Sequence, residues 1–156
     1  RFSFARDNST GGLTLQVPAG AARPSKARLR FAETISTTRR DFRWVRAANA
    51  SLPGDECELP DVPLEKPVFG GGNCLQPIVW EAEELKPTSA PDGGLTYAAT
   101  PKPPKPGHWR GYYIELSYPS VQHPKLHTQV STPGFVWPDT LPFEDCNLAE
   151  CSPRLV

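Results

Sequence analysis

The sequence predicts an all-β domain, a seven-stranded sandwich of two sheets of the fibronectin III or immunoglobulin type. Nineteen Pro and twelve Gly among 156 residues interrupt the chain too often for long helices, because Pro lacks the backbone donor that a helix needs. Apolar residues recur at every second position within short runs, which is the period of a half-buried strand. Seven such runs are separated by turn-forming residues, a spacing typical of sandwiches.

The first three strands are predicted over residues 13–17, 27–31 and 41–46. In the first two runs the odd-numbered residues are apolar, so we expect that side to face the core. The even-numbered Arg28 and Arg30 then point to water. In the third run Phe42 and Trp44 share one side, and Trp44 is the largest expected core anchor.

Residues 47–76 break this rhythm and are predicted to be a loop insertion. The segment contains four Pro residues, the run 70–72 of three Gly, and both Cys57 and Cys74. A structureless stretch of this length is tolerated when a disulfide closes it. In the chain-entropy model such a bridge is worth about 3 kcal/mol.

The remaining four strands are predicted over residues 78–85, 95–99, 109–118 and 126–131. Asp92-Gly93 lies between the first two of these runs and predicts a hairpin turn, because Gly adopts the positive φ that a tight turn needs. The Pro-rich segment 101–107 is expected to be extended and to cross the end of the sandwich.

The run 109–118 is the clearest strand of the sequence. Its even-numbered residues from 112 to 118 are Tyr, Ile, Leu and Tyr, and these are expected to form the centre of the core. The predicted sandwich domain thus covers residues 1–134, and residues 135–156 form a Pro-rich, irregular tail.

Cysteines and glycosylation motifs predict a secreted glycoprotein. Cys57 with Cys74, and Cys146 with Cys151, are the simplest disulfide pairs, although four cysteines allow three connectivities. N-glycosylation motifs begin at Asn8 and at Asn49, both in polar segments where an acceptor Asn would be exposed. Together these features indicate an oxidising, extracellular compartment. Because the sequence contains no Met, we expect a fragment or processed product that begins at Arg1.

The charge balance argues against two classes of partner. Lys plus Arg and Asp plus Glu number 17 each, so no overall field attracts nucleic acid or an anionic membrane. The sequence also lacks an apolar run of about 20 residues, the length that a membrane-spanning helix requires.

No catalytic, cofactor-binding or metal site is predicted. His108, His123 and His127 are the only imidazoles, and Pro124 disrupts the helical geometry that would bring the last two together. The three carboxylates Glu81, Glu83 and Glu84 are expected to form the polar side of a strand, although acid and base of a glycosidase were the alternative.

Three aromatic residues are predicted to lie on the surface: Trp109, Tyr113 and Trp137. Two uses for such a patch remain open. The rings either cover a contact with another domain, which is the favoured interpretation, or form a platform on which a sugar stacks.

Three segments resemble one known family: Lys26 to Arg30, Arg40 to Trp44 and the aromatic run Trp109 to Pro119. They are similar to the C-terminal part of the PhoPQ-activated pathogenicity-related protein family, which includes the autocrine proliferation repressors. Thr128 to Val130 and Pro138 to Phe143 resemble the last strand and the closing segment of that family.

The resemblance implies an α/β-hydrolase-like domain upstream, with a serine in a Gly-x-Ser-Lys elbow, followed by this sandwich. That elbow does not occur in this sequence. The cysteine-bearing segments depart from the bacterial members and point to an extracellular eukaryotic relative. We therefore expect a non-catalytic domain that packs on the hydrolase-like portion of its own precursor or on another protein chain. A free-standing carbohydrate- or receptor-binding module is the alternative.

Overall fold

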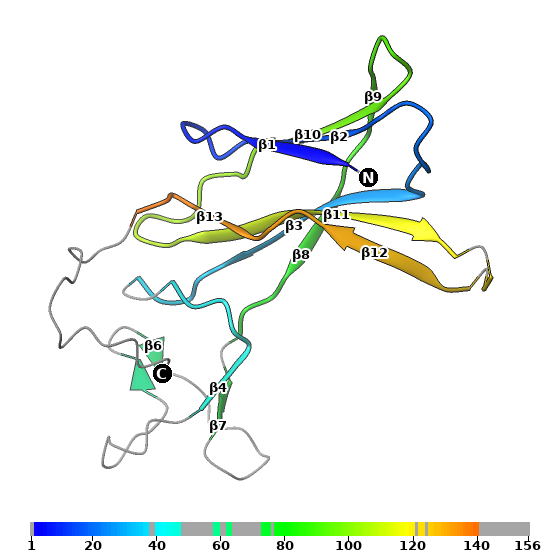
Figure 1. Cartoon of the computed structure of the whole chain (residues 1–156). Coiled ribbons are helices and arrows are strands. Elements are labelled where there is room, and N and C mark those ends of the chain that lie inside the picture. The colour runs from blue at the N-terminus through cyan, green and yellow to red at the C-terminus, as the bar shows by residue number, and fades with distance from the viewer. Residues whose placement is uncertain are drawn as a thin grey trace, which may run out of the picture.

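The computed structural model describes residues 2–37, 40–47, 58–59, 62–63, 73–75, 77–120, 122–123 and 125–140. Every regular element in this part of the chain is a β-strand, so the predicted all-β class is confirmed (Figure 1). Two antiparallel sheets of four and five strands lie one above the other and form the two layers of a sandwich. Among the described residues there is no helix that could cross a membrane.

The smaller sheet has the strand order β1–β2–β10–β9. Its strands are β1 (Ser3–Arg6), β2 (Leu13–Val17), β10 (Leu95–Ala99) and the short β9 (Thr88–Ser89). The central strands β2 and β10 confirm the runs predicted from alternation. Leu15 of β2 pairs with Tyr97 of β10, and both side chains are buried against the second sheet.

The larger sheet has the order β12–β11–β3–β8, with β13 also paired to β11. Its strands are β12 (His127–Ser131), β11 (Arg110–Pro119), β3 (Lys26–Glu33), β8 (Glu81–Glu84) and β13 (Phe135–Trp137). The long central pair β11–β3 places Ile114 opposite Leu29 on the side that faces the smaller sheet.

The core between the sheets follows the predicted register of β11. Tyr112, Ile114 and Leu116 are each 0% exposed. The Tyr112 hydroxyl donates a 2.6 Å hydrogen bond to the Gly11 carbonyl oxygen, which satisfies the one polar group that this strand buries in the core. The even-numbered side of the strand is therefore inside, as alternation predicted.

The opposite side of β11 was expected to face water, and that expectation is wrong for most of it. Glu115 and Ser117 are 8% and 7% exposed, and Ala32 on the adjacent strand β3 is 2% exposed. Phe42 packs over this outer side at Gly111, and Trp80 packs over it at Tyr113. A period of two tells which residues share a side but not whether another segment covers that side.

Residues 41–46 do not form a core strand. The strand here is β4 (Val45–Ala47), which pairs with β7 (Asn73–Leu75) in a separate two-stranded ribbon below the larger sheet in Figure 1. Trp44, the expected core anchor, is 66% exposed. Phe42, the other residue on the predicted core side of this run, packs on the outer side of the larger sheet.

The insertion contains strands that were not predicted. Besides β7 it holds β5 (Glu58–Leu59) and β6 (Val62–Pro63), which pair with each other. Other parts of residues 47–76 lie outside the described residues, including Cys57. Cys74 lies in β7, where its backbone pairs with Arg46.

Two further predictions are corrected near residue 80. The strand predicted over 78–85 is shorter, and it pairs with β3 in the larger sheet. The hairpin partner of β10 is β9, with Gly93 in the turn at a φ of 84°. The turn chemistry was thus predicted correctly, but the strand that enters the turn was not.

The two ends of the described chain contribute strands that alternation missed. β1 and β13 are four and three residues long, too short for a periodic signal. The region from residue 135 was predicted irregular, yet β13 pairs with β11 and extends the larger sheet.

Candidate functional site

Aromatic rings line the outer side of the larger sheet, the side facing away from β2 and β10. The centroid of the Trp80 ring lies 5.5 Å from that of Tyr113 and 6.2 Å from that of Phe42. A Cβ added at Gly111 would lie 3.0 Å from the Phe42 ring, so the absence of a side chain there lets Phe42 approach β11. We call Phe42, Trp80 and Tyr113 the outer aromatic cluster.

One member of this cluster and two residues near it in the sequence expose large apolar side chains. Trp44, Val79 and Trp80 are 66%, 70% and 39% exposed. Val79 and Trp80 are adjacent in sequence, and Trp44 lies two residues from the Phe42 ring that contacts Trp80. We call these three exposed residues the docking rim.

A buried carboxylate lies next to the outer aromatic cluster. Glu115 Oε1 accepts a hydrogen bond from Arg30 at 3.1 Å and lies 3.9 Å from Arg28 Nη1. Both arginines were expected to point freely into water, but they are half-buried because they flank Glu115 across the β11–β3 pair. Sequence reasoning missed this group, although Glu115 shares the odd-numbered side of its strand with Tyr113.

A hollow of about 260 Å³ opens between β11 and the end of β12. We call it the bulge hollow; its walls are formed by Tyr113, Glu115, Gln129, Val130, Ser131, Thr132 and Gly134. Neither Gln129 nor Ser131 was singled out in the sequence, because an isolated polar residue on a strand carries no functional signal.

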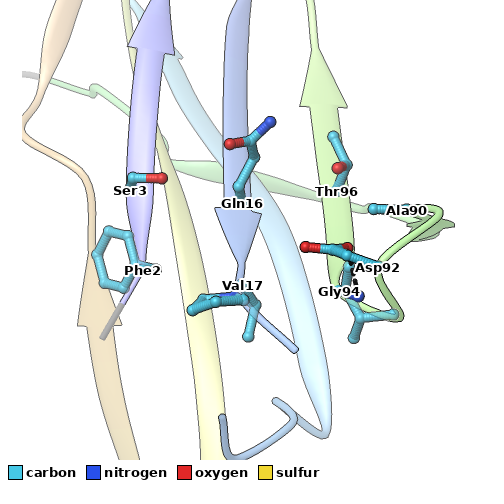
Figure 2. A pocket seen from close by; sticks show the side chains of 10 residues that line it. Phe2, Ser3, Gln16, Val17, Ala90, Asp92, Gly94 and Thr96 are labelled. Atoms are coloured by element: carbon cyan, nitrogen blue, oxygen red, sulfur yellow. Dashed lines mark hydrogen bonds between the residues drawn. The ribbon is translucent and has the colours of Figure 1, made fainter. Parts of the chain in front are cut away.

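Another hollow, of about 340 Å³, lies at one end of the smaller sheet (Figure 2). Ser3, Gln16 and Thr96 form a row across three strands on its floor, and Asp92 projects from the β9–β10 turn. The Asp92 carboxylate accepts a 2.9 Å hydrogen bond from the Gly94 N–H and so holds the turn. Phe2 is the one aromatic residue that lines this hollow, and its side chain is partly buried against the core.

The three aromatic residues predicted to form one surface do not do so. Trp109 is 5% exposed, and its Nε1 donates a 2.8 Å hydrogen bond to the Thr140 carbonyl oxygen. Trp137 pairs with Arg110 on the inner side of β11, and its ring lies 2.9 Å from where a Cβ on Gly11 would be. Tyr113 alone of the three lies in the outer aromatic cluster.

His108 lies just before the start of β11, whereas His123 and His127 lie near its other end. His108 Nδ1 lies 2.7 Å from the Thr34 carbonyl oxygen and therefore carries the proton of that hydrogen bond. His108 lines a hollow of about 490 Å³ in which Glu33 is paired with Arg110 at 3.1 Å and with Lys105 at 3.8 Å. His123 and His127 are exposed in the loop before β12 and at its start.

The glutamates of β8 are all exposed, and Glu81 and Glu83 alternate with Ala82 and Glu84 along this edge strand. Charged side chains on an edge strand oppose unwanted strand pairing, which is an ordinary structural use for them. In the described part of the chain, no three His, Cys, Asp or Glu side chains are grouped so as to hold a metal ion.

Of the predicted modification sites, the structure describes Asn8 and the backbone of Cys74. Asn8 is exposed in the loop between β1 and β2. The other predicted sites lie outside the described residues: Asn49, Cys57, Cys146 and Cys151.

Comparison with known proteins supports one relation. The chain is 27% identical over 148 residues to autocrine proliferation repressor protein A of Dictyostelium discoideum, which covers 93% of this chain and 25% of that protein. The chain thus spans about a quarter of the length of this curated relative. No protein-family model matches the chain, and no solved structure matches it.

Proposed function

We propose that this chain is a non-catalytic accessory β-sandwich that docks on another part of a longer, secreted glycoprotein. The docking rim carries this proposal, because Trp44, Val79 and Trp80 expose apolar surface beside an aromatic cluster. The similarity to a quarter of a longer relative supports it, since a domain of such a protein has neighbours to contact.

We further propose that the neighbour is an α/β-hydrolase-like portion, as the resemblance to the PhoPQ-activated pathogenicity-related family implies. In the same proposal the two sheets pack in the fibronectin III manner. The strand order supports a sandwich of this kind, because antiparallel β2–β10 and β11–β3 pairs face each other across one core. This assignment would place the chemistry of the whole protein outside the present chain.

Docking is tested by expressing the chain together with the hydrolase-like portion of its precursor and measuring co-elution on a sizing column. Val79→Ser with Trp80→Ser replaces exposed apolar surface by hydroxyls, so the double variant should lose co-elution while the sandwich stays folded. Leu126→Ser is the matched control, because Leu126 is 59% exposed beyond the far end of β11. Equal retention of the partner by all three proteins would contradict the proposal.

The extracellular assignment is tested by mass spectrometry of protein from its native source. We expect bridges Cys57–Cys74 and Cys146–Cys151, and N-linked glycan on Asn49 more fully than on Asn8. Peptide mapping without reduction identifies the bridges, and a glycosidase-induced mass shift identifies the glycans. Free thiols at all four cysteines together with unmodified Asn8 and Asn49 would contradict secretion.

A further inference from the structure

The bulge hollow exists because the partner of β11 changes along one edge. β12 pairs with the second half of β11, up to Ser131 opposite Glu115, and β13 pairs with the first half, from Phe135 opposite Tyr112. Three residues, 132–134, therefore lie opposite two, 113–114, which is the count of a β-bulge.

The bulge is held by Thr132 rather than by a regular ladder. The Thr132 N–H donates to the Ile114 carbonyl oxygen at 3.0 Å, and the Ile114 N–H donates to the Thr132 hydroxyl at 3.1 Å. These two bonds pair both backbone groups of Ile114 with Thr132. Because Phe135 is already opposite Tyr112, Pro133-Gly134 is the segment left opposite Tyr113. A Cβ at Gly134 would have no neighbour within 4 Å, and Gly134 and Tyr113 line the same open hollow.

Polar groups surround this space on the same side of the sheet. Ser131 lies opposite Glu115, and Gln129 lies opposite Ser117. An amide, a hydroxyl and a carboxylate therefore line the same hollow as the Tyr113 ring. The ion pair with Arg30 fixes the Glu115 carboxylate, and Glu115 is 8% exposed. Gln129 and Ser131 are exposed, so both can donate and accept hydrogen bonds to a ligand.

We propose that the bulge hollow binds a single saccharide ring. The axial C–H groups of a pyranose form an apolar face that fits an aromatic side chain such as Tyr113, and its hydroxyls require donors and acceptors around the rim. The hollow of about 260 Å³ is smaller than pockets for drug-sized ligands, which start at roughly 300 Å³, so we expect a ligand of a single ring. No residue of the docking rim lines the bulge hollow, although the Trp80 ring contacts Tyr113 from outside it. A sugar in the hollow therefore goes beyond the proposed docking function.

NMR titration of the full chain with a panel of sugars tests this site. The panel holds the methyl glycosides of glucose, galactose, mannose and N-acetylglucosamine, together with glucuronic acid; glycine serves as a small polar ligand that is not a sugar. At least one sugar should shift the amide signals of Tyr113, Gln129 and Ser131, with a dissociation constant on the order of 1 mM. No shift with any sugar, or the same shifts with glycine, would overturn the proposal.

Variants separate the site from general effects on folding. Tyr113→Leu removes the aromatic face and should weaken binding roughly threefold to tenfold. Gln129→Ala lies on an exposed edge strand, should stay folded, and should weaken binding roughly fivefold. Gln16→Ala is the control, since it makes the same change on the other sheet and should bind as the parent chain does. Unchanged binding in Gln129→Ala and Tyr113→Leu would contradict the assignment.

The docking proposal fails by a different measurement. Val79→Ser with Trp80→Ser alters the docking rim and replaces no residue that lines the bulge hollow. Its one effect on the hollow is the loss of the contact between the Trp80 and Tyr113 rings. This variant should keep the sugar-induced shifts of Gln129 and Ser131 while it loses the partner chain. A negative co-elution experiment therefore leaves the sugar proposal standing, and a negative sugar titration leaves the docking proposal standing.

Discussion

Asp7 organises the loop between β1 and β2 through both oxygens of its carboxylate. Oδ1 accepts hydrogen bonds from the Ser9 hydroxyl and N–H at 2.7 and 2.8 Å, and Oδ2 accepts one from the Thr10 hydroxyl at 2.8 Å. The bonds from Ser9 and Thr10 favour the charged form and lower the pKa of Asp7 from 3.8 to about 2.

The sign of the resulting pH dependence follows from this depressed pKa. Because the folded value lies below the ordinary one, Asp7 stabilises the fold above a pH of 3.8, and this contribution is lost as the pH falls through about 2. We expect an NMR titration of the Asp7 carboxyl carbon to show a midpoint near 2. Asp7→Asn should remove this part of the acid sensitivity. A midpoint at the ordinary value would show that the hydrogen bonds do not form.

Gly11 occupies a position that other residues fill only with strain. Its φ is 72°, and a Cβ there would lie 2.9 Å from the Trp137 ring and 3.0 Å from the Tyr112 hydroxyl oxygen. Gly11→Ala should lower the free energy of unfolding by about 2 to 4 kcal/mol, from left-handed backbone strain and overpacking together. Gly20→Ala is the control, because Gly20 has a φ of 77° but no neighbour within 4 Å. It should cost about 1 kcal/mol in the same denaturant titration.

At the scale of elements, alternation predicted four strands closely. β2, β10, β11 and β12 begin and end within one residue of the predicted positions, although only the first three have a buried side. The failures share a cause: a period of two shows which residues share one side of a strand, but not whether another segment covers that side. Trp109 was expected on the surface, but it is buried: Thr34 bonds its backbone, and its indole N–H donates to the Thr140 carbonyl oxygen.

The candidate site shows the same limit. Tyr113 was predicted from its odd-numbered position, whereas the bulge hollow beside it depends on the change of partner from β12 to β13. No local pattern reports this change, because β13 is three residues long and its pairing with β11 is fixed by tertiary packing. The residues opposite Tyr113 become identifiable only once both registers are known.

The register of β11 is tested by truncating its most buried leucine. Leu116 is 0% exposed, so Leu116→Ala should leave a cavity and cost about 2 to 5 kcal/mol in the free energy of unfolding. Leu126→Ala makes the same change at a side chain that is 59% exposed and should stay within roughly 0.5 kcal/mol of the parent. Equal losses in urea titrations of the two variants would refute this register.

At the scale of the whole molecule, β1 and β13 join the two sheets at one edge. Phe4 on β1 lies 6.1 Å from Phe135 on β13, centroid to centroid. Arg6 crosses the same gap, where its guanidinium lies 5.2 Å from the centre of the Phe135 ring. It donates a 3.2 Å hydrogen bond to the Val136 carbonyl oxygen and pairs with Asp139 at 3.2 Å.

The balance of forces at Arg6 favours its charged form despite burial. Burial would lower the pKa of Arg6, but hydrogen bonds to Tyr112 and Asp139 outweigh it and raise the pKa. The side chain of Arg6 is 15% exposed, whereas that of Asp139 is 58% exposed. The cation is thus held mainly by its contacts within the sandwich, and the carboxylate is a surface partner.

This difference predicts unequal effects of two conservative substitutions. Arg6→Lys keeps the charge but loses the planar fork that reaches Val136, Asp139 and the Phe135 ring together, so it should cost about 1 to 3 kcal/mol. Asp139→Asn removes an exposed partner and should cost at most about 1 kcal/mol. Urea denaturation of both variants at neutral pH measures the two costs. We expect the several contacts of Arg6, rather than its ion pair alone, to hold the two sheets together at this edge. A larger loss of unfolding free energy in Asp139→Asn than in Arg6→Lys would instead mean that electrostatic attraction holds this edge together.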